Sequence, residues 1–186
     1  MRTLRLAWAA VLLMLAGAAA AGTYSDADFV LYYLGPGGEV PVLSTSPLPP
    51  GSNVPPNNRW RYDYRVLNKS ANPLNTWTVY FNSDNVDNAH YVSGSAPANW
   101  VITKLGPVAP NFNYKIRFRT TVAGAKIPSN GVLVCSVTFD WTGPTVPGVQ
   151  NYDAVNDGGS ESGVTTELTA TPTQPTTWGR IKALYR

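Results

Sequence analysis

Residues 59–81 read RWRYDYRVLNKSANPLNTWTVYF. Two runs in this stretch alternate between apolar or aromatic and polar residues, and a cluster of turn residues separates them. The apolar and aromatic positions are Trp60, Tyr62, Tyr64, Val66, Trp77, Val79 and Phe81. Successive side chains of a strand point to opposite faces, so each run has one face to bury. The pattern predicts two strands, paired antiparallel, with these side chains in a core.

Similar patterns elsewhere predict an all-β chain. Further strands are expected at residues 28–34, 40–43, 100–103, 112–120, 131–141 and 164–169. Residues 44–58 contain five prolines, which supply no ladder donor, so this segment is expected to be a connection. Residues 82–98 read as a polar stretch, and residues 152–163 as acidic and rich in Gly and Ser. The predicted fold is an antiparallel Ig-like or jelly-roll-like β-sandwich with a short C-terminal helix or tail.

The ends of the chain predict its domain organisation. Residues 1–21 resemble a secretory signal peptide, because Arg2 and Arg5 precede an apolar run that ends in small residues. This apolar run is shorter than the ~20 residues that a membrane-spanning helix needs. The β-sandwich is expected over residues 22–170, a Thr/Pro linker over 171–177, and a basic amphipathic tail over 178–186.

Charge and cysteine content narrow the function classes. Subtracting Arg2 and Arg5 from 14 basic residues leaves 12, against 11 acidic residues, a net charge of +1. So small an excess does not predict a nucleic-acid partner. The single cysteine, Cys135, rules out an intrachain disulfide and lies in an apolar alternation typical of a buried thiol.

The sequence also resembles a known class of module. It contains Trp60-x-Tyr-x-Tyr-x-Val-x-Asn68-x-Ser70, then Pro73-Leu74, Trp77-x-Val-x-Phe81, Trp100 and Ile127-Pro128. This order resembles β-sandwich domains of secreted bacterial proteins and is similar to the cellulose-binding type of carbohydrate-binding module, over residues 59–141. The C-terminal residues are similar to a tail found on some exported bacterial proteins.

Catalysis is not expected. A nucleophilic triad needs a base near neutral pH, and the only histidine, His90, lies in a polar stretch without a Gly-x-Ser-x-Gly motif. One Cys and one His do not provide a zinc site, and no cofactor is expected. Calcium has candidate ligands in two oxygen-rich segments, Asp84 and Asp87 in one and Asp153 and Asp157 in the other. The alternative is that these residues simply form turns.

Two sets of residues are candidates for ligand binding. The first consists of aromatic rings that could stack on sugars, and its members are Tyr80, Tyr91, Trp100, Trp141 and Tyr152. The alternative for these rings is burial in the core. The second is the basic row Lys115, Arg117 and Arg119, with Arg61 and Arg65 as further candidates, which could hold an acidic polysaccharide. The alternative is a solvated strand face whose charges discourage edge pairing.

The sequence therefore predicts an exported, non-catalytic β-sandwich with a structural or adhesive role at or outside the bacterial cell surface. The alternative is a carbohydrate-binding module that uses exposed aromatic rings or a basic strand face. The expected partners are a polysaccharide or another cell-surface protein, with no nucleic acid and no membrane span once the signal peptide is removed.

Overall fold

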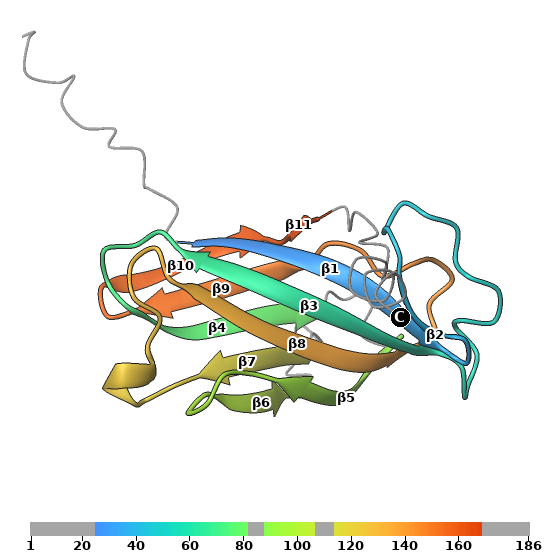
Figure 1. The fold of residues 1–186 in the computed structure, drawn as a ribbon, viewed down its shortest axis with the longest axis horizontal. Coiled ribbons are helices and arrows are strands. Elements are labelled where there is room, and N and C mark those ends of the chain that lie inside the picture. Colours follow the sequence, from blue (N-terminus) through green and yellow to red (C-terminus); the bar gives the residue numbers. More distant parts are fainter. Residues whose placement is uncertain (1–24, 82–87, 107–113, 169–186) are drawn as a thin grey trace, which may run out of the picture.

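Two β-sheets pack face to face to form a sandwich (Figure 1). The computed structural model describes residues 25–81, 88–106 and 114–168. A single 3-10 turn, Ala123–Ala125, is the helical structure within these ranges, and no helix there is long and apolar enough to cross a membrane. The all-β sandwich is confirmed, whereas the predicted signal peptide, linker and C-terminal tail lie outside the described residues.

The first sheet, sheet A, has six strands. They are β1 (Ser25–Gly35), β2 (Gly38–Pro41), β3 (Arg59–Asn68), β5 (Ala89–Ser95), β8 (Val132–Trp141) and β11 (Thr166–Glu167). Their order is β11-β1-β3-β8-β5, with β2 also paired to β1. All pairs are antiparallel except β1 with β11, which is parallel.

The second sheet, sheet B, has five antiparallel strands. They are β4 (Leu74–Phe81), β6 (Val101–Leu105), β7 (Tyr114–Arg119), β9 (Asn151–Asn156) and β10 (Gly159–Val164). Their order is β10-β9-β4-β7-β6, so β4 and β7 lie inside the sheet with neighbours on both sides.

The predicted antiparallel pairing of the two runs in residues 59–81 is wrong. The first run is β3 in sheet A, the second is β4 in sheet B, and residues 69–73 carry the chain from one sheet to the other. The two aromatic faces meet across the core, where the rings of Tyr64 and Trp77 lie 4.8 Å apart. The buried Asn68 side chain holds the crossover by donating hydrogen bonds to the carbonyls of Asn72, Ile127 and Pro128. Alternation of apolar and polar residues specifies which face of each strand is buried. Two strands in facing sheets bury their apolar faces just as two strands of one hairpin do, so alternation does not distinguish the two arrangements.

The core consists of the inward side chains of both sheets. All seven apolar and aromatic positions of residues 59–81 are at most 4% exposed, which confirms that they belong to the core. Cys135 on β8 is 2% exposed, and burial raises the pKa of its thiol well above the ordinary value. The predicted structural role of this cysteine therefore fits its surroundings.

Three strands lie where the sequence did not predict them. Strand β5 lies in the polar stretch 82–98, and β9 and β10 form a hairpin within residues 151–164. Both β5 and β10 are edge strands with few buried side chains. An edge strand has less apolar surface to bury, so its alternation is weak in the sequence.

Candidate functional site

A row of three basic side chains follows strand β7 on the outer surface of sheet B. Lys115, Arg117 and Arg119 alternate with Ile116 and Phe118, whose side chains are 0% exposed in the core. Because β7 pairs with β4 and β6, the row lies inside the sheet rather than at its rim. The structure thus brings together the basic residues that the sequence proposed as a ligand-binding row.

Tyr80 and Asp153 lie on the same outer surface. Tyr80 on β4 is the register partner of Lys115, and the Lys115 ammonium nitrogen lies 4.7 Å from the centre of the Tyr80 ring. The Tyr80 hydroxyl donates a hydrogen bond to the Asp153 carboxylate, and the Ser162 hydroxyl donates another at 2.6 Å. Burial, followed by the bond to Asp153, raises the pKa of Tyr80 to about 12. We call the surface formed by Tyr80, Lys115, Arg117, Arg119 and Asp153 the basic face.

The cations of the basic face differ from most other basic side chains of the described residues in whether a carboxylate neutralises them. Five basic side chains in the described part of the chain form ion pairs with carboxylates, namely Arg59, Arg61, Arg65, Lys69 and Lys126. Lys115, Arg117 and Arg119 form none with any residue in those ranges. The Nε of Arg117 is also buried without a hydrogen-bond partner among the described residues. The basic face therefore holds cations that a ligand can neutralise.

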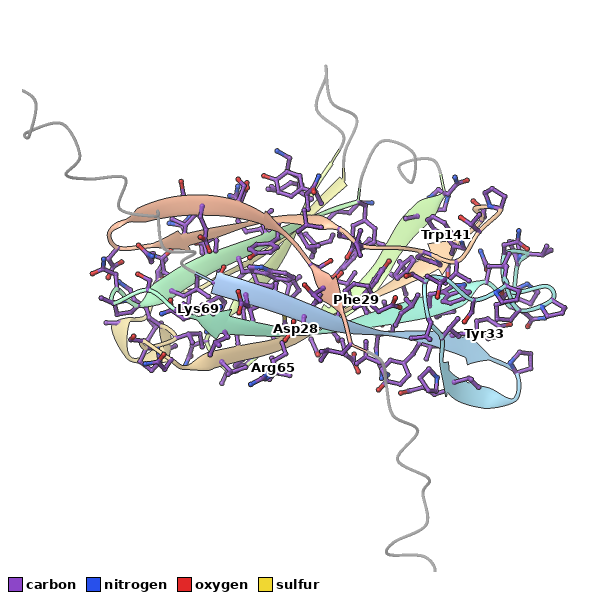
Figure 2. The ribbon with its side chains drawn as sticks, turned by 90° about the horizontal axis from the view of Figure 1, so that it is seen from above. Asp28, Phe29, Tyr33, Arg65, Lys69 and Trp141 are labelled. Carbon is purple, nitrogen blue, oxygen red and sulfur yellow. The ribbon has the colours of Figure 1, made fainter. Side chains whose placement is uncertain are left out.

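Arg61 and Arg65, the further candidates for this row, do not join it. Both lie on β3, on the outer surface of the opposite sheet, and both are paired with acids. Arg61 contacts Glu39 at 2.6 Å and Asp63 at 2.7 Å. Arg65 lies beside Asp28, 3.8 Å away, on the neighbouring strand β1 (Figure 2). Spacing of two along a strand places side chains on one face but does not say which sheet carries that strand.

Sheet A has a shallow depression of about 510 Å³ on its outer surface. Arg61 and Asp63 form one side, and small residues of β5 and β8, including Ser95 and Ser136, line the rest. The Arg61 guanidinium is held by its two acids and lies 4.8 Å above the Tyr32 ring. The Arg61 charge on this outer surface of sheet A is therefore already neutralised by acids, in contrast to the charges of the basic face.

Most of the proposed sugar-stacking rings are buried. Trp100, Trp141 and Tyr152 are 8%, 2% and 4% exposed. Their polar atoms donate to the backbone carbonyls of Ala125, Thr145 and Ser25 respectively. Tyr91 is half-buried against the core. The alternative interpretation, that these rings fill the interior, therefore applies to them, and Tyr80 is the candidate aromatic that lies on the basic face.

The calcium candidates do not form one site. Asp84 and Asp87 lie outside the described residues. Asp153 accepts hydrogen bonds from Tyr80 and Ser162, whereas Asp157 accepts from Lys126 at 2.8 Å and from Asn75 at 3.0 Å. The hydrogen bond with Lys126 is the main cause that lowers the pKa of Asp157. Within the described ranges, no three His, Cys, Asp or Glu side chains form a group suited to a metal ion.

Sequence reasoning missed the contact of Tyr80 and Ser162 with Asp153. Tyr80 and Asp153 are 73 positions apart, and only the pairing of β4 with β9 brings them together. Ser162 opposes Asp153 across the β9–β10 hairpin. The alternation in residues 151–156 could have predicted that Asp153 lies on the outer surface, because it places Asp153 on the face opposite to Tyr152 and Ala154.

Comparisons with known proteins concern the sandwich as a whole. No protein-family model and no curated protein matches the sequence. Similar solved structures include a family IIIA CBD from Clostridium cellulolyticum, with 16% identity, covering 75% of this chain and 96% of that one, at a TM-score of 0.38. Another is the seventh ScaB type I cohesin from Pseudobacteroides cellulosolvens, with 11% identity, covering 62% and 86%, at a TM-score of 0.34.

A third similar structure is an inactive mutant of a GH20 exo-β-N-acetylglucosaminidase from Vibrio harveyi, at 14% identity and a TM-score of 0.37. The match covers 78% of this chain but only 18% of that enzyme.

Proposed function

We propose that this chain is an exported, non-catalytic β-sandwich that attaches to acidic polymers at or outside the cell surface through its basic face. The observation that carries the proposal is the row of Lys115, Arg117 and Arg119, which has no ion-pair partner among the described residues. Five other cations in these ranges do have acidic partners. The uncompensated charge is thus concentrated on one outer surface.

The shape of the row suits an extended ligand. Residues two apart in a strand are separated by about 6.8 Å, so the three charges extend over roughly 14 Å. A polymer with regularly spaced anions can contact them together. Two opposite charges 4 Å apart in water attract by about 1 kcal/mol, which corresponds to about fivefold in affinity for each contact. Several such contacts give useful binding without a deep pocket, and salt weakens it.

The residues that would serve nucleophilic catalysis lie elsewhere. His90 is exposed on β5, in sheet A, and Cys135 is buried with a raised pKa. A buried thiol with a raised pKa is a poor nucleophile because the thiolate is the reactive form. The positions of these two side chains support a binding role rather than a catalytic one.

Equilibrium binding of the exported protein, residues 22–186, to polygalacturonate at low and high salt tests the proposal. Lys115→Gln and Arg119→Gln should each weaken binding about fivefold, and added salt should weaken it further. The matched control is Arg59→Gln, which removes a cation from sheet A that is already paired with Asp140. Insoluble cellulose serves as the uncharged comparison. Absent or salt-insensitive binding to the acidic polymer, or an equal loss in the control, contradicts the proposal.

A further inference from the structure

Asp153 is an acidic side chain on a surface that otherwise favours anions. It lies on β9 opposite Thr78 of β4, and Thr78 in turn lies opposite Arg117 of β7. One row across the sheet therefore runs from Arg117 through Thr78 to Asp153 and on to Ser162 of β10. A carboxylate at this position repels a polyanion. Charge attraction between the basic face and an anionic ligand therefore does not explain the presence of Asp153.

The carboxylate of Asp153 is held in a fixed orientation. Tyr80 and Ser162 donate to its two different oxygens, and Lys115 lies over the ring of Tyr80. An ionised carboxylate has about four acceptor positions, so two donors leave it able to accept more. Hydrogen bonds to an ionised acceptor are roughly twice as strong as neutral ones, and a fixed acceptor loses little entropy on binding.

The distance across the row suits a sugar polymer. Neighbouring strands lie about 4.8 Å apart, so the backbones at Arg117 and Asp153, two strands apart, are separated by about 10 Å. Thr78 between them is 5% exposed and does not stand above the surface. A ligand lying across the strands meets a cation at one end and a hydrogen-bond acceptor at the other.

We propose that Asp153 makes the basic face selective for acidic polysaccharides, which carry hydroxyl groups as well as anions, over acidic polymers without hydroxyl groups. The ligand's anions contact Lys115, Arg117 and Arg119, while a sugar hydroxyl donates to Asp153. An acidic polymer without hydrogen-bond donors meets only the repulsion of this carboxylate. This inference rests on the proposed function and adds the ligand class to it.

The test compares polygalacturonate with ionised polyacrylate, which has carboxylates but neither hydroxyl nor N–H groups. Asp153→Asn removes the negative charge with little change of shape. It should strengthen polyacrylate binding about fivefold, because a repulsion of about one charge pair is lost. It should leave polygalacturonate binding unchanged or weaker, because a charge-assisted hydrogen bond is lost as well. The preference for polygalacturonate should therefore fall by about fivefold to tenfold.

Two further variants make the result specific. Asp140→Asn removes an acid from the outer surface of sheet A and should leave the preference unchanged. Ser162→Ala keeps the Asp153 charge but removes one donor that orients it, so it should reduce the preference without strengthening polyacrylate binding. If Asp153→Asn does not fold, Ser162→Ala still tests the selective role of Asp153.

The outcomes separate this inference from the proposed function. Equal strengthening of both polymers by Asp153→Asn, or an unchanged preference in Ser162→Ala, overturns the selective role and leaves attachment to acidic polymers standing. Absence of binding to either polymer by the wild-type protein overturns both.

Discussion

A buried polar contact joins the two layers of the sandwich. Tyr64 on β3 is 1% exposed, and its hydroxyl donates to the side-chain carbonyl oxygen of Gln150, which is 2% exposed and directly precedes β9. The amide nitrogen of the same glutamine has no partner among the described residues. Only one of the two polar atoms of the Gln150 amide therefore has a hydrogen-bond partner. Substitutions at Tyr64 and Gln150 can measure how much this contact contributes to the free energy of unfolding.

The cost of each substitution follows from the atoms left unpaired. Tyr64→Phe removes the donor and leaves both polar atoms of the Gln150 amide without a partner, which costs about 1–3 kcal/mol of unfolding free energy. Gln150→Met leaves the Tyr64 hydroxyl without an acceptor and should cost about the same. The double variant removes every buried polar atom of the pair. It should be less destabilised than the two single costs combined, with a coupling of about 1–3 kcal/mol.

Urea unfolding of the four proteins in this double-mutant cycle measures the coupling, provided that the m-value is unchanged. Tyr62→Phe is the matched control, because the Tyr62 hydroxyl donates to the Gly148 carbonyl at 2.7 Å rather than to Gln150. Its cost should add to that of Gln150→Met. If the effects of Tyr64→Phe and Gln150→Met also add to within about 0.5 kcal/mol, the reasoning from this contact is refuted.

Two further predictions concern the buried rings and the tyrosine hydroxyls. Trp100→Ala should lower the free energy of unfolding in urea by about 3–5 kcal/mol, because the ring lies in the core. It should leave polygalacturonate binding intact under native conditions. Loss of binding at wild-type stability would contradict this. The stability that Tyr62, Tyr64 and Tyr80 contribute should be full well below about pH 10 and should fall as pH rises toward 12, because unfolded tyrosines ionise near pH 10 while the pKa values of these three are raised in the folded state. Tyr80→Phe should reduce that fall, as measured by urea unfolding across this range.

Sequence alternation was sufficient to predict the fold class and most of the core. It placed Trp60, Tyr62, Tyr64 and Trp77 in the interior and the three β7 cations outside, and the structure agrees. Alternation works here because burial on one face imposes a period of two on any strand. It was weakest at the edge strands β5 and β10, where few side chains are buried.

The tertiary structure alone decided which residues meet. Residues 59–81 look like a hairpin, but their two strands lie in different sheets, and this places Arg61 and Arg65 on the surface opposite Lys115 and Arg117. Strand pairing also brought Glu39 to Arg61, whose other acid, Asp63, is a local neighbour on β3, and it left the β7 row without an ion pair in the described ranges. Alternation along the chain was enough to specify a two-sided, aromatic-cored sandwich, because side-chain direction is a local property of a strand. Apart from Arg61 with Asp63, the ion pairs join residues far apart in the sequence, so the pairing of strands determines which charges are left without a partner.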